Sequence, residues 1–215
     1  LFNNRIYGLT KGQYSPTSEL GKVTRSTPMG SLDRPFNPLA LALGSGATFV
    51  CRTIDRETKH MQAIIKRSYS HKGTAFIEIY QNCNIFNDGA FAPMTDKESK
   101  ADKVLWLENG QPMLFGAKQN KGIRLDGNKP IVVTIGKKWS VDDLLVHDEG
   151  DYVIASLLSN MTYQDDFPDP IGVLYAIDAP TYEDLMSDQI DKSVKQKGIS
   201  SVQDLLDAGD TWIVK

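Results

Sequence analysis

Apolar runs of strand length recur along the first 80 residues. Residues 1–2 form the end of a strand that we expect to be buried, and Asn3 and Asn4 then end it by competing for backbone hydrogen bonds. Residues 47–51 are continuously apolar, as expected of a strand that is buried on both faces. Residues 74–80 give a third strand.

Two segments with helical features separate these strands. Asn37 is suited to cap a short helix over residues 39–43 that has Pro38 at its first position. A second helix is expected to begin at Thr53 or Asp55, because apolar residues then recur at helical spacing as far as Tyr69. The alternation of strands and helices is typical of a parallel sheet flanked by helices.

Residues 5–35 separate the first strand from the first helix and are rich in Gly, Pro, Ser and Thr. We expect a long loop with one short helix near residues 9–14. A compact domain seldom contains so long an irregular segment unless the loop is functional. This segment is therefore the first place to look for a site.

After Asn87 the pattern becomes that of a smaller α+β region. A hairpin with an Asn-Gly turn is expected over residues 104–115. Further strands are expected at 131–135 and 172–177, and helices at 141–146, 152–161 and 183–197. We accordingly divide the chain into residues 1–88 and 89–215.

The composition is that of a globular chain: 215 residues, 40% hydrophobic and 24% charged. No apolar run approaches the ~18 residues that a membrane span requires, and aromatic residues do not interleave with basic ones as in nucleic-acid-binding proteins. Cys51 and Cys83 do not make a disulfide framework and suit a reducing cytoplasm. Cys51 lies within an apolar run and is expected to be a small buried hydrophobe.

The charge is unevenly distributed along the chain. The net charge is −3, with +6 on residues 1–87 and −9 on residues 88–215. A basic front half suits anionic ligands, and an acidic back half suits solvation or a basic partner. The alternative is that both halves present ordinary solvated faces.

Polar residues cluster where the predicted strands end, which is where parallel sheets bind ligands. The side-chain oxygen of Asn4 and the carbonyl of Ile6 can offer two hard oxygen ligands to one Mg²⁺. Gly8 lets the backbone approach a bulky anion closely. An Asn-Asn pair after a strand is otherwise explained by a turn, and the three histidines have no metal-ligand spacing.

Several motifs follow one another in a fixed order. Residues 3–17 read NNRIYGLTKGQYSPT, and STPMG, PFNP, GATFV and CNIFN follow at residues 26–30, 35–38, 46–50 and 83–87. In this order they resemble the beta subunits of 2-oxoacid:ferredoxin oxidoreductases, and the resemblance covers residues 1–90 and then fades. It implies an α/β fold class: the second half of a thiamine-diphosphate-binding fold, with a parallel sheet flanked by helices, followed by the smaller α+β region.

The resemblance also implies cofactor ligands. Asn4 would bind Mg²⁺ through its side chain and Ile6 through its carbonyl, and Gly8, Leu9 and Thr10 would contact thiamine diphosphate. The family's motif begins with Gly-Asp-Gly, whose aspartate would lie before residue 1. We therefore expect the chain to be a fragment that is inactive alone.

Two further residues receive roles from the resemblance. Lys11 stands in a form of the motif similar to that of enzymes that accept 2-oxoglutarate, so it would pair with the distal carboxylate of that substrate; the alternative is a solvated loop lysine. Cys83 would be the last of four ligands to a 4Fe-4S cluster. Its three companions would precede residue 1, so Cys83 is expected to be a free thiol here. No catalytic residue is singled out.

The implied function is that of part of a cytoplasmic oxidoreductase. It would oxidatively decarboxylate a 2-oxoacid, with 2-oxoglutarate expected, to an acyl-CoA and pass electrons to ferredoxin. An alpha subunit is the expected partner, with no nucleic acid and no membrane. The alternatives are another thiamine-dependent 2-oxoacid decarboxylase, a pyruvate-specific relative, or a noncatalytic assembly module.

Overall fold

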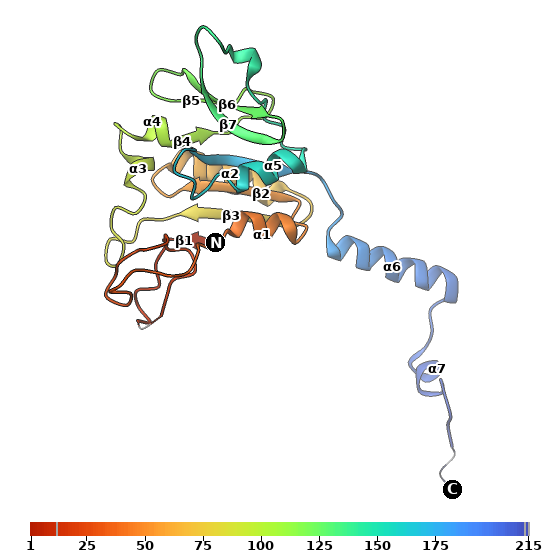
Figure 1. The fold of residues 1–215 in the computed structure, drawn as a ribbon. Coiled ribbons are helices and arrows are strands. Elements are labelled where there is room, and N and C mark those ends of the chain that lie inside the picture. The colour runs from red at the N-terminus through yellow and green to blue at the C-terminus, as the bar shows by residue number, and fades with distance from the viewer. Residues whose placement is uncertain (12, 213, 215) are drawn as a thin grey trace. The chain divides into compact units, whose positions relative to one another are not determined.

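A five-stranded mixed sheet runs through the first of two units into which the chain divides (Figure 1). The computed structural model describes residues 1–11, 13–212 and 214, and the two units are Leu1–Ala179 and Pro180–Lys215. The strands of this sheet lie in the order β1 (Phe2–Asn3), β3 (Ala75–Tyr80), β2 (Phe49–Ile54), β8 (Asp169–Ala176) and β4 (Val104–Trp106).

The first three strands run parallel, as the sequence pattern predicted. β3 pairs in parallel with both β1 and β2, whereas β8 pairs antiparallel with β2 and parallel with β4. The expectation that the first strand is buried is wrong. Among the described residues β1 is an edge strand that pairs with β3, and Leu1 and Phe2 are 55% and 66% exposed.

Helices pack on both faces of the sheet. α1 (Pro38–Gly44) and α5 (Tyr152–Ser159) share a core with Val50 and Leu174 on one face. α2 (Thr58–Ser70) packs Ile64 against Cys51 on the other face. Successive side chains of a strand point to opposite faces, so the fully buried β2 contributes to both layers.

The helix starts illustrate one correct and one wrong prediction. The Asn37 Oδ1 accepts a hydrogen bond from the Ala40 backbone N at 3.1 Å and so caps α1 as predicted. The predicted start of the second helix at Thr53 or Asp55 is wrong. β2 continues to Ile54, and α2 begins only at Thr58.

Residues 5–35 form the long loop that their composition predicted. The short helix expected near residues 9–14 is not found in the described part of that segment. The loop folds back on itself through backbone hydrogen bonds: Gly21 N donates to Ser31 O at 2.8 Å, and Phe36 N donates to Pro16 O at 2.7 Å. These hydrogen bonds explain how the loop keeps one path although its described residues form no helix or strand.

The second sheet is antiparallel and consists of β5 (Leu114–Phe115), β6 (Lys121–Asp126) and β7 (Lys129–Thr134). The hairpin predicted over residues 104–115 is wrong, because β4 pairs with β8 and β5 pairs with β6. The Asn109 Oδ1 accepts a hydrogen bond from the Glu149 backbone N at 3.0 Å, so the expected turn is held against a distant segment.

The remaining predicted elements of the first unit are largely present. β7, α5 and β8 correspond to the elements expected at residues 131–135, 152–161 and 172–177, whereas β6 was missed. The helix expected at 141–146 is shortened to the 3₁₀ helix η1 (Val141–Asp143). Two further short helices are α3 (Ala92–Thr95) and α4 (Lys100–Lys103).

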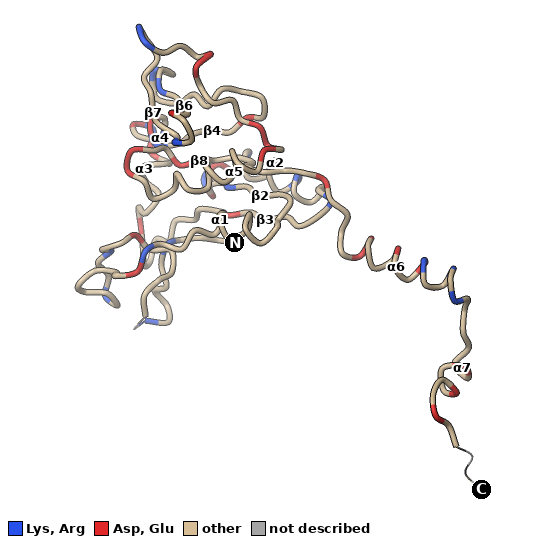
Figure 2. The backbone as a smooth tube through the Cα atoms, turned by 45° about the vertical axis from the view of Figure 1, so that its right-hand side comes forward, with Lys and Arg blue, Asp and Glu red and all other residues tan. Residues whose placement is uncertain are grey.

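Figure 2 shows Lys and Arg on the loop of residues 5–35 and on the β5–β7 sheet. The loop contains five basic and two acidic residues, and residues 116–139 contain six basic and one acidic residue. The acidic character of the back half of the chain therefore does not extend to its second sheet.

The second unit contains α6 (Tyr182–Lys197) and α7 (Val202–Leu206), each begun by a capping box. The helix predicted at 183–197 is confirmed. Among the described residues, no helix is long and apolar enough to cross a membrane. The division at residue 88 stays a prediction, and residues 89–179 contribute β4 and β8 to the main sheet.

Candidate functional site

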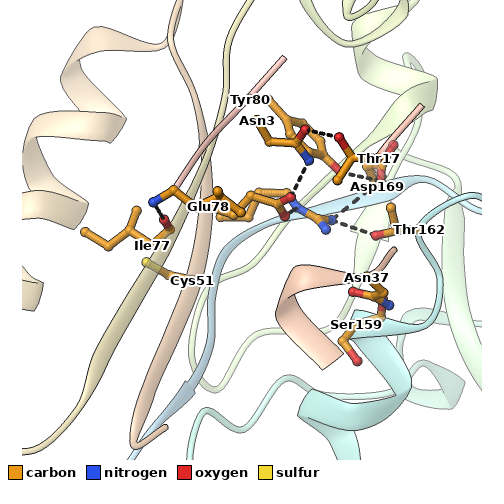
Figure 3. A network of polar contacts seen from close by, with 12 residues as sticks. Asn3, Thr17, Asn37, Cys51, Ile77, Glu78, Tyr80, Ser159, Thr162 and Asp169 are labelled. Carbon is orange, nitrogen blue, oxygen red and sulfur yellow. Dashed lines mark hydrogen bonds and ion pairs between the residues drawn. The ribbon is translucent and has the colours of Figure 1, made fainter. Parts of the chain in front are cut away.

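Asn3, the last residue of β1, fixes the start of the loop to the sheet (Figure 3). It is 3% exposed, and its Oδ1 accepts hydrogen bonds from the Arg5 backbone N at 3.0 Å and from Thr17 Oγ1 at 2.8 Å. Its Nδ2 donates to Glu78 Oε1 at 2.8 Å. Both ends of this amide are used within the protein, so Asn3 has a structural role.

Asn4 and Ile6 lie together in the next turn of the chain. The Asn4 Oδ1 accepts a hydrogen bond from the Ile6 backbone N at 3.3 Å, and both residues are half-buried. A carbonyl-type oxygen has two lone pairs, so this bond leaves Asn4 able to bind a cation. The structure thus brings together the two residues predicted to bind Mg²⁺.

Gly8 lies against Phe86, a residue nearly 80 positions later. A Cβ atom added at Gly8 would lie 2.1 Å from the Phe86 Cγ, far closer than two carbons can approach. Gly8 therefore allows this loop to contact the segment after β3. The prediction that Gly8 gives room to an anion does not capture this packing role.

Asn87 makes the second connection between these segments. Its Nδ2 donates to the backbone O of Asn4 at 3.0 Å and to that of Arg5 at 3.3 Å. Its own backbone N donates to Cys83 O at 2.9 Å, which closes a tight turn that carries the half-buried Cys83. The predicted metal loop and the predicted cluster cysteine are thus parts of one hydrogen-bonded structure.

Three strands contribute charged side chains to a buried cluster beside Asn3 (Figure 3). Arg52 of β2 is fully buried, and its Nε donates to Glu78 Oε2 at 2.7 Å. Its Nη1 donates to Thr162 Oγ1 at 2.7 Å and lies 3.5 Å from Asp169 Oδ1. Burial raises the pKa of Asp169, while the nearby guanidinium of Arg52 acts in the opposite direction.

Residues 1–79 match the family model of the thiamine pyrophosphate enzyme C-terminal TPP-binding domain. The 2-oxoglutarate oxidoreductase subunit KorB of Mycobacterium tuberculosis is 43% identical over 218 aligned positions, which cover 100% of this chain and 58% of that subunit. Along its whole length the chain is thus similar to a subunit of a 2-oxoacid oxidoreductase of this kind.

Two further proteins are similar to the chain over part or most of its length. The 2-oxoacid:ferredoxin oxidoreductase beta subunit of Saccharolobus solfataricus is 49% identical over 86 residues, 40% of this chain and 28% of that one. A solved 2-oxoglutarate:ferredoxin oxidoreductase from Magnetococcus marinus matches with a TM-score of 0.64 and 26% identity, over 96% of this chain and 56% of that one. The chain thus spans a little over half the length of the relatives that it matches along its whole length.

The other residues of this loop that were predicted to contact cofactor or substrate are exposed. Leu9, Thr10 and Lys11 extend into solvent, with Leu9 82% exposed, and Lys11 adopts a positive φ of 52°. The Thr10 hydroxyl accepts a hydrogen bond from Gln13 Nε2. Their roles toward cofactor and substrate stay predictions, because these contacts within the chain do not test them.

The ligand atoms that this chain offers determine how well it fits Mg²⁺ and a 4Fe-4S cluster. Two oxygens, from Asn4 and Ile6, suit a share of an octahedral Mg²⁺ site, whose other ligands come from the cofactor, water or other protein residues. A 4Fe-4S cluster needs four thiolates. The described residues offer only Cys83, because Cys51 is 0% exposed and burial raises the pKa of its thiol to about 12. They do not fit a cluster by themselves.

The histidines have structural partners. His60 and His71 contact the hydroxyls of Thr53 and Thr48, and His147 contacts the Val173 carbonyl O at 2.8 Å. Within the described residues, no group of three His, Cys, Asp or Glu side chains could hold a metal.

Proposed function

We propose that this chain forms part of the beta subunit of a 2-oxoglutarate:ferredoxin oxidoreductase. In the whole enzyme, 2-oxoglutarate is decarboxylated oxidatively, coenzyme A takes the acyl group, and ferredoxin takes the electrons. The support comes from similar proteins. Two KorB subunits belong to a 2-oxoglutarate oxidoreductase and a 2-oxoglutarate synthase, and a similar solved structure has 2-oxoglutarate, coenzyme A and succinyl-CoA bound.

One observation supports this proposal above the others. Phe86 and Asn87, from the Cys-x-x-Phe-Asn motif, pack against and hydrogen-bond the Asn4–Gly8 turn. A thiamine enzyme that passes electrons to an iron-sulfur cluster needs its cofactor loop and a cluster ligand in one rigid neighbourhood. A nonoxidative decarboxylase has no such need, so this contact favours the oxidoreductase.

Different residues are proposed to bind the metal, the cofactor and the cluster. When bound, thiamine diphosphate supplies the electron sink for decarboxylation. Asn4 Oδ1 and the Ile6 carbonyl hold the Mg²⁺ of the cofactor, and Gly8 contacts the cofactor through its backbone. Leu9 and Thr10 line the pocket next to the cofactor, and Cys83 contributes one thiolate to a 4Fe-4S cluster completed by other residues of the enzyme.

The proposal includes a partner and a location. The family name of a beta subunit implies an alpha subunit, which we infer completes the site over the exposed loop residues. Ferredoxin is the proposed electron acceptor. A cytoplasmic location follows from the proposal, because the cluster cysteine and its companions must stay reduced.

Lys11 is proposed to select 2-oxoglutarate by pairing with its distal carboxylate. The test uses the assembled enzyme with Lys11→Ala, and with Lys118→Ala as the matched control because Lys118 is also an exposed loop lysine. Hydrogen bonds to charged groups contribute about 1.5–3 kcal/mol, so kcat/KM for 2-oxoglutarate should fall about 10- to 100-fold while that for pyruvate stays the same. Equal losses on both substrates would remove the pairing.

Iron content separates the proposed oxidoreductase from its alternatives. The assembled enzyme should contain iron and sulfide, and Cys83→Ser should lower the iron content without changing the binding of thiamine diphosphate. A wild-type enzyme that lacks iron and decarboxylates 2-oxoacids would instead favour a nonoxidative thiamine enzyme.

A further inference from the structure

We propose that Arg5 is a positioning residue that sets the geometry of the two Mg²⁺ ligands on either side of it. This inference rests on the proposed function, because it concerns the metal that Asn4 and Ile6 hold there. Arg5 itself does not contact the metal or the cofactor in this scheme. Its role is to fix the backbone from which both ligands project.

The backbone of Arg5 is held in an uncommon conformation. Its φ is +54°, in the left-handed region that residues other than Gly, Asn and Asp rarely adopt. Its N donates to Asn3 Oδ1, and its O accepts from Ser18 Oγ at 2.5 Å and from Asn87 Nδ2 at 3.3 Å. Three separate segments therefore fix the peptide groups that flank the ligand residues.

The side chain of Arg5 is anchored as firmly as its backbone. The residue is only 6% exposed although it begins a surface loop. Its guanidinium carbon lies 5.0, 4.8 and 4.9 Å from the ring centres of Tyr80, Phe91 and Tyr163. Its Nη1 donates to Glu19 Oε1 at 3.0 Å. A planar, permanently charged group packed among three rings is a site that lysine cannot reproduce.

The three rings come from segments far apart in sequence, and those of Tyr80 and Phe91 lie in the protein core. Tyr80 ends β3 and is fully buried, Phe91 precedes α3, and Tyr163 follows α5. Tyr163 also donates to the Thr17 carbonyl at 3.2 Å, which ties the far side of the loop to the same place. The side chain of Arg5 thus connects the strained turn to the rigid sheet.

This arrangement has a consequence for metal binding. A left-handed turn at a non-glycine residue stays populated only when its surroundings hold it. Without the Arg5 side chain, only backbone hydrogen bonds hold the two peptide groups between Asn4 and Ile6, so the two oxygens converge less firmly. Residues that orient metal ligands typically change metal affinity about 10- to 100-fold when they are replaced.

The test compares Arg5→Lys with Arg67→Lys in the assembled enzyme. Arg67 is a matched control because it also lies over an aromatic ring, that of Phe49 at 5.7 Å, and pairs with a carboxylate, that of Glu149, but it belongs to α2. Calorimetry would give the dissociation constants of Mg²⁺ and thiamine diphosphate, and thermal melting without cofactor would give the stability. Arg5→Lys is expected to weaken Mg²⁺ binding about 10- to 100-fold while melting no lower than the control.

A second variant guards against poor folding. Arg5→Gly relieves the strain of the positive φ and removes the side-chain anchor, so it should also weaken Mg²⁺ binding. Wild-type Mg²⁺ affinity in either Arg5 variant, or an equal loss in Arg67→Lys, would overturn the positioning role. A wild-type enzyme that binds neither Mg²⁺ nor thiamine diphosphate would overturn the proposed function itself, which is a separate and distinguishable result.

Discussion

Replacing Arg52 by methionine should destabilise the fold strongly, although Arg52 touches no proposed ligand. The substitution leaves the carboxylates of Glu78 and Asp169 buried without the cation that both contact at 2.7 and 3.5 Å. Removing one partner of a buried ion pair costs about 3–5 kcal/mol. For a chain of this length, each kcal/mol lowers the melting temperature by about 2–4 °C, so Arg52→Met should melt about 6–20 °C lower.

The assay is thermal melting together with urea unfolding, both followed by circular dichroism, with Arg67→Met as control. Arg67 pairs with Glu149 at a half-exposed position, so its loss should cost no more than about 1 kcal/mol. The double variant Arg52→Met, Glu78→Gln removes one charge of each sign and should be more stable than Arg52→Met alone. A loss for Arg52→Met no larger than that of the control would refute the reasoning.

The pH dependence gives an independent check on the same variant. Asp169 has a raised pKa in the folded protein, so the folded state holds its proton more tightly than the unfolded chain does. Stability from such a group is fully present below the unfolded pKa of about 3.9 and is lost as pH rises through the folded pKa. Arg52→Met removes the cation that opposes this shift, so its stability deficit should grow as pH rises from the unfolded pKa of about 3.9 to neutral pH. A deficit that is constant over this range would contradict the assignment to Asp169.

Three further substitutions or treatments test the local contacts. Gly8→Ala should destabilise the fold by about 1–3 kcal/mol through its clash with Phe86. The loss should be smaller in a Phe86→Ala background. Equal losses in both backgrounds, measured by thermal melting, would exclude the clash. Asn37→Ala should lower the free energy of unfolding by about 1 kcal/mol through loss of the helix cap, whereas Asn37→Asp should retain most of it in the same urea assay. Cys83 should react with a thiol reagent in the folded chain and Cys51 only after unfolding, because Cys51 is 0% exposed and its thiol pKa is raised to about 12; labelling of Cys51 without unfolding would show that the core opens locally.

Local signals explain which parts of the fold were predictable. Asn37 followed by Pro38 is a helix start that depends on neighbours in sequence, and the structure contains it. The Asn-Gly turn at 109–110 is equally local, but its strand pairing is not: β4 finds β8, which lies over 60 residues later. Pairing partners follow from the whole sheet, and a turn signal cannot report them.

The buried charges were the largest omission, and a signal for them was present. Arg52 directly follows the apolar run of residues 47–51, where the predicted strand ended, yet β2 continues to Ile54. Glu78 likewise interrupts the apolar residues of β3. Charges of opposite sign inside two neighbouring buried strands indicate a pair, because an unpaired charge there is too costly. Asp169 could not be foreseen, since nothing local places β8 beside β2.

The order of the loop at 5–35 follows from these same polar contacts rather than from apolar burial. Asn3 and Arg5 connect its first residues to Glu78, Tyr80 and the rings around them, and the loop closes on itself further along. Ordering one residue costs about 1–2 kcal/mol of backbone entropy, which a flexible binding loop loses when its ligand arrives. In this protein the loop is already ordered by the fold before any ligand binds. The ligand therefore does not have to order the loop when it binds. For this reason we expect that loosening an anchor such as Arg5 lowers cofactor affinity before it lowers stability.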